Sequence, residues 1–224
     1  MLLIVLWALV LAALIAAQVT ALGRRETLIA ANLRTADVAA AAADGAVEEA
    51  VFRLMRHEAG WDPDGTPHSL AIGQARVVVT ITDESGKLNI NTAPLDQIVA
   101  VLVSVGVPDD QAPSLAAAIT AWRGDGIGGD MRGALIQSYR GAGLDYAPPF
   151  QPFETPDELR LVLGMTPDLY ARLAPRISIY SGATQGIVTI DARATDVRGG
   201  SFARHAVVRL SGPDGYSLLS WGHQ

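Results

Sequence analysis

The stretch GKLNINTAPLDQI, residues 86–98, marks the point where the chain changes from a strand pattern to a helix pattern. Before it, residues 70–82 (LAIGQARVVVTIT) alternate apolar and polar side chains, which predicts one strand. Within it, Thr92 can cap a helix that starts at Pro94, where the missing N–H of proline is harmless. Such a run can open a helix-hairpin-helix unit that grips nucleic acid, or a helix in a domain that binds only protein.

Helical patterns continue from this point until the strand patterns return at Arg176. Capping and periodicity predict helices that start near these residues: Pro94, Pro113, Gly133, Thr155 and Thr166. Four strand segments follow: RISIYS, IVTIDARA, SFARHAVVRLS and YSLLSW. Because strands flank residues 92–175, we expect a helical domain inserted into a smaller α+β domain.

The first 22 residues, MLLIVLWALVLAALIAAQVTAL, carry no charged side chain. At about 1.5 Å per residue, a helix of this length crosses the roughly 30 Å of bilayer hydrocarbon. The alternative is a cleaved secretory signal, since residues 12–18 (AALIAAQ) offer small side chains at a cleavage point. We favour a retained helix because no basic segment precedes the apolar run. Arg24 and Arg25 alone would place the following residues in the cytoplasm, so the orientation stays open.

The helix is expected to continue beyond the membrane to about His57, because no proline interrupts it. Val47, Val51 and Leu54 recur at i, i+4 and i+7 and so form one apolar face. A turn at residues 62–65 (DPDG) follows. One helix should therefore begin in lipid and end packed along a soluble domain.

The overall charge argues against nucleic acid and the motifs argue against catalysis. The formal net charge is −6, from 23 acidic and 17 basic residues, whereas phosphate binding normally needs a basic stripe. The hairpin at residues 104–110 carries Asp109 and Asp110 where cations would help. There is no cysteine, and no HExxH, GxSxG or P-loop pattern occurs.

Over nearly its whole length the chain resembles the minor pseudopilin GspK family of type II secretion. The stretches that carry the resemblance, besides the apolar N-terminus, are SGKLNINTA (85–93), AITAWRGDG (118–126), FETPDELRLVLGMTPDLYARL (153–173) and RISIY (176–180). The resemblance implies an α+β fold with a pilin-like long N-terminal helix packed on an antiparallel sheet. An all-α, helix-hairpin or SAM-like domain is inserted in it. The implied ranges are a transmembrane part at 1–22, helix and first strands at 23–91, the insertion at 92–175 and the remaining strands at 176–224.

The resemblance also implies a function without catalysis. GspK-like proteins look like the tip of a pseudopilus that supports export of folded proteins across the outer membrane. The expected location is the bacterial inner membrane, single-pass, with the soluble domain in the periplasm. Expected partners are GspI-like and GspJ-like minor pseudopilins, the prepilin peptidase during maturation, and secreted substrates. The alternative is a membrane-anchored or secreted helix-hairpin-helix protein that binds nucleic acid.

Along the N-terminal helix, the resemblance assigns roles to several residues. Val5 stands where most pilin-like subunits have a glutamate that pairs with a neighbour's amine. A subunit with nothing ahead of it avoids a costly unpaired carboxylate by having valine there. Met1 is either the processed and methylated first residue or follows an upstream start. Assembly contacts are expected on the apolar face that includes Leu28, Val47, Val51 and Leu54.

In the insertion, the resemblance points to calcium at Asp125 and Asp130. Relatives typically have two aspartates after the Trp-Arg pair and a glutamate after a Gly-Ala pair. Here Trp122-Arg123 is followed by Gly124-Asp125-Gly126, and Gly133-Ala134 by Leu135. Since calcium takes about six to eight oxygen ligands, the aspartates either support calcium or are solvated loop residues. No other cofactor is expected.

Aromatic residues gather in the proline-rich run YAPPFQPF, residues 146–153. Tyr146, Phe150 and Phe153 are candidates for a contact patch that binds a partner pseudopilin or a secreted substrate, because aromatic residues often anchor interfaces. The alternative for all three is packing within the core and its loops.

Overall fold

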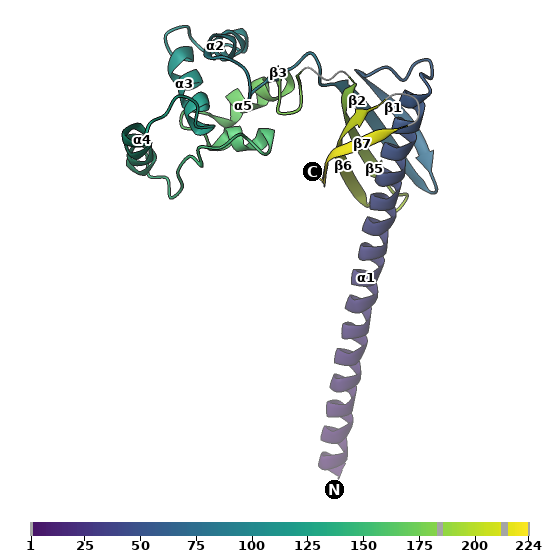
Figure 1. Cartoon of the computed structure of the whole chain (residues 1–224). Coiled ribbons are helices and arrows are strands. Elements are labelled where there is room, and N and C mark those ends of the chain that lie inside the picture. Colours follow the sequence, from purple (N-terminus) through teal and green to yellow (C-terminus); the bar gives the residue numbers. More distant parts are fainter. Residues whose placement is uncertain (1, 183–185, 212–214, 224) are drawn as a thin grey trace. The chain divides into compact units, whose positions relative to one another are not determined.

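The computed structural model of the chain describes two compact units (Figure 1). One unit contains residues 1–82 and 188–224, and the other contains residues 83–187. The backbone is described for residues 2–182, 186–211 and 215–223, and side chains are described for these residues except 2–5, 8–10 and 15–32.

The first unit combines one long helix with a five-stranded sheet. The helix α1 spans Leu2–Met55. The strands are β1 (Asp64–Ile72), β2 (Ala75–Asp83), β5 (Ile187–Thr195), β6 (Ser201–Leu210) and β7 (Tyr216–His223). Their order in the sheet is β1-β2-β5-β6-β7, and both outer pairs are antiparallel.

The C-terminal half of α1 packs on one face of this sheet (Figure 1). Its contact face is rich in alanine, including the fully buried Ala43 and Ala50. Opposite it, Val77, Val79 and Ile81 alternate with more exposed residues along β2 and are completely buried. Each such apolar side chain contributes about 1.5–3 kcal/mol when buried, so this helix–sheet layer is the main core of the unit.

The prediction of one strand over residues 70–82 is wrong. The chain reverses at Gly73 and Gln74, so Ile72 pairs with Ala75 across a two-residue hairpin. Gly73 has a φ of +58°, a left-handed conformation that glycine adopts without strain. The alternation shifts by one residue at this turn, because Leu70 and Ile72 share a face with Val77 and Ala75. Apolar residues continue on both sides of the turn, so the two strands resemble one.

The second unit is mainly helical. Its helices are α2 (Leu95–Ser104), α3 (Ala112–Trp122), α4 (Gly129–Gly141) and α5 (Pro167–Leu173), with 3-10 helices η1 (Pro156–Leu161) and η2 (Ala174–Arg176). The fourth predicted helix is thus only the 3-10 helix η1, although Thr155 and Glu158 form its expected capping box. Thr166 caps α5 as predicted, since its hydroxyl accepts a hydrogen bond from the Leu169 N–H at 3.2 Å.

Two short strands bring the ends of the second unit together. Here β3 (Leu88–Asn89) pairs in parallel with β4 (Ile177–Ser178). The segment RISIYS therefore does not join the antiparallel sheet, because Ile177 is buried in the core of the helical unit. The compact unit at 83–187 extends beyond the expected insertion at 92–175 on both sides.

The helix α2 begins one residue after its predicted start at Pro94, but Thr92 does not cap it. The N–H groups of Thr92 and Ala93 both donate to the carbonyl oxygen of Asn89, which folds these residues into a turn. The helix begins at Leu95, with Pro94 as its N-cap and no capping side chain. Thr92 is therefore not the cap.

Candidate functional site

Of the α1 residues that are expected to act in assembly, three are buried, and the side chains of the others are not described. Val47, Val51 and Leu54 are buried in the core that α1 forms with its own sheet. These three residues therefore stabilise the fold and are not open to a partner helix. Met1 and the side chains of Val5 and Leu28 lie outside the described residues.

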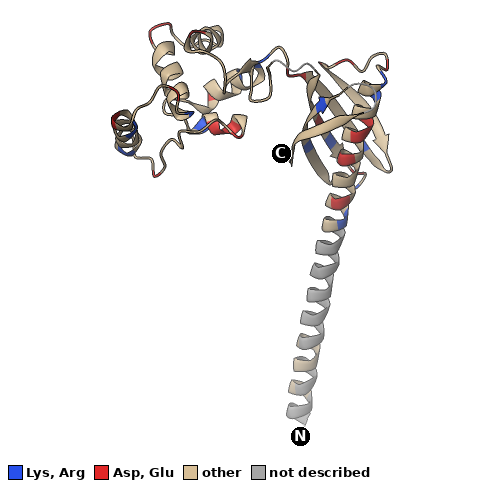
Figure 2. Cartoon of the chain, viewed as in Figure 1, with Lys and Arg blue, Asp and Glu red and all other residues tan. Residues whose placement is uncertain are grey.

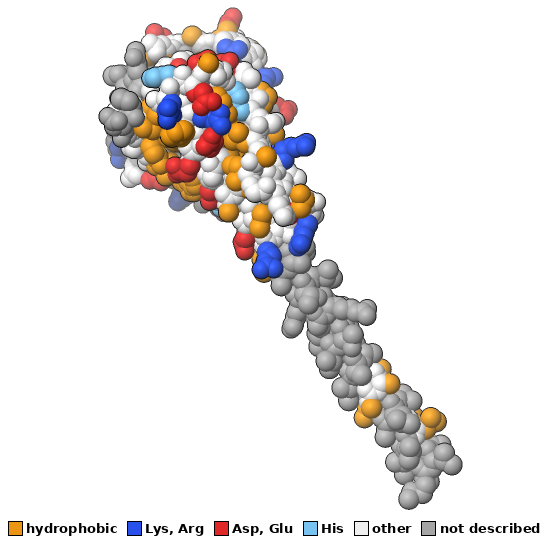
Figure 3. Space-filling model, turned by 90° about the vertical axis from the view of Figure 1, so that its right-hand side faces the viewer, with side chains coloured by type: hydrophobic (Ala, Val, Ile, Leu, Met, Phe, Trp, Pro, Cys, Tyr) orange, Lys and Arg blue, Asp and Glu red, His pale blue; other side chains and the backbone are white. Residues whose placement is uncertain are grey.

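Other apolar side chains of α1 are open to solvent. Leu33, Val38 and Phe52 each expose 42% or more of their surface. Figure 3 shows hydrophobic side chains exposed along the described parts of the helix. Within those parts, no helix is long and apolar enough to cross a membrane. The predicted membrane segment at residues 1–22 lies mostly among side chains that are not described.

Asp125 is bound by an arginine in this structure. Its carboxylate accepts a hydrogen bond from Arg123 Nε at 2.7 Å, and it remains half exposed. Asp130 is exposed in the first turn of α4. Among the described residues, no group of three or more His, Cys, Asp or Glu side chains could hold a metal ion. Calcium at these aspartates stays a prediction, for which the described residues supply no acidic cluster.

The stretch 86–98 is held by polar side chains whose role the sequence did not reveal. Arg123 is buried and donates to the carbonyl oxygens of Ile90 and Ala93. The Asn91 side chain exchanges two hydrogen bonds with the backbone of Phe153, at 2.7 and 2.9 Å. The asparagines of this stretch thus join distant segments of the helical unit. The alternation Asn-Ile-Asn at residues 89–91 was the sequence signal that could have indicated these contacts.

The three aromatic candidates have different environments. Phe153 is only 2% exposed and stacks on Trp122, with ring centroids 6.1 Å apart. This position favours the alternative of core packing for Phe153. Tyr146 and Phe150 are half-buried and therefore still accessible. The Arg132 guanidinium lies 5.0 Å from the centre of the Phe150 ring, within range of a cation–π interaction.

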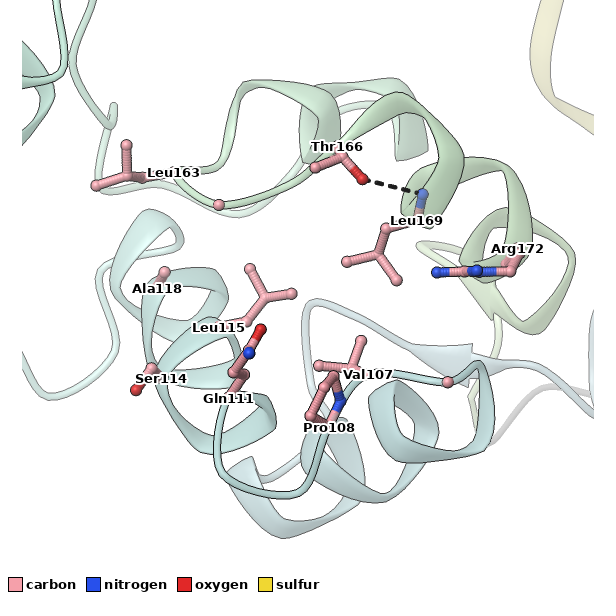
Figure 4. A pocket seen from close by; sticks show the side chains of 12 residues that line it. Val107, Pro108, Gln111, Ser114, Leu115, Ala118, Leu163, Thr166, Leu169 and Arg172 are labelled. Carbon is pink, nitrogen blue, oxygen red and sulfur yellow. Dashed lines mark hydrogen bonds between the residues drawn. The ribbon is translucent and has the colours of Figure 1, made fainter.

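The helical unit contains an open cavity of about 500 Å³ between its two glycine hairpins (Figure 4). Gly106 in the first hairpin and Gly164 in the second both have a φ of +91°. Each hairpin lets the chain reverse and enter the next helix, α3 or α5. Half of the twelve lining residues have apolar side chains: Val107, Pro108, Leu115, Ala118, Leu163 and Leu169.

The polar groups of this cavity support binding rather than proton transfer. The lining contains Gln111, Ser114, Thr166 and Arg172 but no carboxylate, histidine or cysteine. Among the described residues, Arg172 forms no ion pair. A cavity with one guanidinium and aspartates at residues 109–110 beside its rim lacks the basic surface that nucleic acid needs.

The pKa values of two tyrosines in the helical unit are raised, further from neutral pH. Burial raises the pKa of Tyr139, whose hydroxyl oxygen accepts a hydrogen bond from the Leu163 N–H at 2.9 Å. Burial also raises the pKa of Tyr170, with a further contribution from Asp157. Both phenols are therefore protonated at neutral pH and are not suited to act as general bases there.

Charge is distributed without a basic stripe over the described residues of either unit (Figure 2). Ion pairs neutralise several of the cations, such as Arg53 with Glu49 and Glu58, and Arg204 with Asp44. The described residues therefore lack the basic surface that is typical of phosphate binding.

Comparison with known proteins supports a type II secretion component. A family model described as "Type II secretion system (T2SS), protein K" matches residues 76–182, which include most of the helical unit. A chain in the crystal structure of the GspK-GspI-GspJ complex from enterotoxigenic Escherichia coli has the same fold. The match has a TM-score of 0.68 and 15% sequence identity, and covers 89% of this chain and 99% of that chain. Comparison with curated protein sequences gives no match.

The family match and the fold agree with the motifs noted in the sequence. The matched residues 76–182 contain the LNINTA stretch, the Trp122-Arg123 pair and the second hairpin. The long helix, antiparallel sheet and helical unit are arranged within a fold shared with the secretion complex. Residues 76–182 thus match the type II secretion protein K family, and the chain shares its fold with one chain of the GspK-GspI-GspJ complex.

Proposed function

We propose that this chain is a minor pseudopilin that assembles with GspI-like and GspJ-like subunits at the tip of a type II secretion pseudopilus. The observation that carries the proposal is the match of residues 76–182 to protein K, on a helical unit with its own core. The fold shared with a chain from a GspK-GspI-GspJ complex supports the choice of partners. The tip complex supports export of folded proteins and has no catalytic role.

The assembly test uses the GspI-like and GspJ-like proteins of the same organism. The chain is co-expressed with both, and the mass of the purified complex is measured by light scattering. One copy of each subunit is the expected composition. If the chain elutes alone at every concentration tested, the proposed assembly is wrong.

We propose in addition that residues 1–22 anchor the chain in the inner membrane, with the soluble part in the periplasm. Support comes from the sequence, which has no charged side chain in this segment. Processing by the prepilin peptidase would leave Met1 as a methylated first residue, and Val5 would need no partner amine. Intact mass and N-terminal sequencing of the membrane-extracted protein test this. A chain that begins near Gln18 would instead indicate an ordinary cleaved signal.

The helical unit supplies the bulk that would prevent another subunit from adding above the tip. Tyr146 and Phe150 are the accessible aromatic candidates there for contact with a partner or a secreted substrate. Deleting the unit should leave the rest of the chain able to fold. Restoring secretion in a strain that lacks the native protein, with and without this deletion, measures its contribution.

A further inference from the structure

A buried guanidinium holds the turn between α3 and α4. The Arg123 side chain is only 5% exposed, and two of its nitrogen atoms lie 2.7 Å from Asp125 Oδ2. The same group donates hydrogen bonds to the carbonyl oxygens of Ile90 and Ala93. Arg123 thus gathers one carboxylate and two backbone carbonyl oxygens. These are types of oxygen that calcium takes as ligands.

The charges of this turn balance without a metal. Residues 123–132 contain two arginines and two aspartates and no other charged side chain. Asp130 is exposed in the first turn of α4, where the helix dipole favours a carboxylate. Calcium affinity depends on the number of charged ligands. One carboxylate that is bound by arginine and one that is solvated therefore offer a cation a poor set.

The positions that would add ligands carry no side-chain oxygen. Glycines at positions 124 and 126 flank the single aspartate that follows Trp122-Arg123, where the resemblance to GspK-like proteins implies two aspartates. The same resemblance implies a glutamate after Gly133-Ala134. Leu135 stands there instead and packs against the core of the helical unit. The side chains of the turn thus differ from a calcium site in both number and chemistry.

The backbone of the turn is fixed by hydrogen bonds and packing. The N–H groups of residues 123–125 donate to carbonyl oxygens in the last turns of α3. Gly124 has a φ of +86°, as is usual for a glycine just after a helix. A Cβ there would lie 2.8 Å from the Phe150 carbonyl oxygen, so the turn lies directly against this segment. Contacts within the chain therefore supply the order that a bound cation would otherwise provide.

We propose that Arg123 takes the place of a metal ion in this turn, so that the helical unit reaches its full stability without calcium. The guanidinium binds the oxygen atoms that a cation would need, and its positive charge repels a cation from Asp125. The proposal chooses between the two roles that the sequence leaves open for Asp125 and Asp130. It goes beyond the proposed function, because it concerns this chain alone and does not depend on whether partner subunits bind.

The test is a calcium titration of the full chain, purified in detergent without partner subunits. Extracellular calcium modules have dissociation constants of about 10⁻⁴–10⁻³ M, so the titration extends to about 10 mM calcium. Titration calorimetry measures binding, and scanning calorimetry compares the unfolding midpoint in calcium and in EDTA. We expect no saturable binding and the same midpoint in both solutions. A midpoint that rises with calcium concentration overturns the proposal, because it shows that the folded chain binds the ion.

Two single variants test the part that Arg123 plays. Arg123→Gln removes the charge and should lower the unfolding midpoint in EDTA by about 5 °C or more. Arg140→Gln, at an exposed position in the last turn of α4, is the matched control and should leave the midpoint unchanged. Equal midpoints for Arg123→Gln and the unmodified chain contradict the proposal.

A double variant shows where calcium binds if the unmodified chain does bind it. Asp125→Asn combined with Asp130→Asn removes both carboxylates of the turn. Loss of calcium binding in this variant assigns the ion to the turn, and retained binding assigns it to another part of the chain. Calcium-dependent stability contradicts the proposal in both cases. The proposed assembly with partner subunits is not affected by either result.

Discussion

Arg123 at the end of α3 donates a hydrogen bond at 2.7 Å to the carbonyl oxygen of Ala93, just before α2 begins. The same guanidinium also donates to Ile90 and to Asp125. One buried side chain thus joins the entry stretch of the helical unit to the end of its second helix. A planar group with five N–H donors is suited to this task.

Replacing Arg123 should destabilise the helical unit. We expect Arg123→Ala to lower the free energy of unfolding by about 3 kcal/mol, because buried carbonyl oxygens lose their donors. Arg123→Lys should recover only part of this loss, since an ammonium cannot reproduce the fork of bonds. Urea unfolding followed by tryptophan fluorescence measures both. Arg140→Ala, at an exposed position of α4, is the control and should change the free energy of unfolding little. An equal effect at Arg140 would show that the hydrogen bonds of Arg123 are not the cause of the loss.

The aromatic candidates should separate into one core residue and one surface residue. Phe153→Ala should cost about 3–5 kcal/mol of stability, because Phe153 is stacked on Trp122 in the core. Phe150→Ala should cost less, since its ring is partly exposed. Thermal unfolding measures both, and titration with the partner subunits then tests Phe150. Unchanged affinity of a folded Phe150→Ala protein would count against a contact role for this residue.

Two neighbouring glycines offer a matched pair of substitutions. A Cβ at Gly124 would lie 2.8 Å from the carbonyl oxygen of Phe150, whereas one at Gly126 would meet nothing within 4 Å. Both have a positive φ, +86° and +69°. Gly126→Ala should therefore cost only the conformational penalty of about 1 kcal/mol, and Gly124→Ala should cost at least twice that. Chemical denaturation of both variants checks the ranking, and equal costs would mean that the loop at Phe150 moves aside.

Alkaline pH should destabilise the helical unit through its buried tyrosines. Burial raises the folded-state pKa of Tyr139 above the ordinary value of a tyrosine, about 10, so folding favours the protonated phenol. That contribution is fully present below the unfolded pKa and is lost as pH rises through the folded one. Stability should therefore fall above about pH 10. Tyr139→Phe should fall less steeply over the same pH range in urea titrations, and an unchanged slope would assign the loss to other groups such as Tyr170.

Local chemistry made several elements predictable. Periodicity after Pro113 predicted the second helix, which is confirmed as α3 at Ala112–Trp122. Thr166-Pro167 predicted the start of α5 correctly because capping depends on neighbouring residues only. The hairpin at Gly73 was missed, because its two-residue turn shifts the alternation by only one residue and strand-forming residues continue on both sides. The parallel pairing of β4 with β3 was also missed, since contacts between residues about ninety positions apart leave no local periodic signal.

The candidate site was less predictable for the same reason. Helical spacing identified Val47, Val51 and Leu54 as one apolar face, but periodicity does not distinguish a chain's own sheet from a partner helix. The proline-rich run marked Phe153 as an aromatic candidate, and only the packing on Trp122 shows that it is buried. Exposure of β7 depends on strand order, which follows from long-range pairing.

The parallel pair of β3 and β4 has a consequence for how this protein could have arisen. Leu88 and Ile177 are paired neighbours, and the Glu84 N–H donates to the carbonyl oxygen of Ile187. The chain thus leaves the sheet after β2 and re-enters it at β5, which is the neighbour of β2 in the sheet. The departing and returning segments are hydrogen-bonded to each other. A short hairpin could join the same two strands. The helical unit can therefore grow, shrink or be exchanged between relatives while the sheet keeps its strand order.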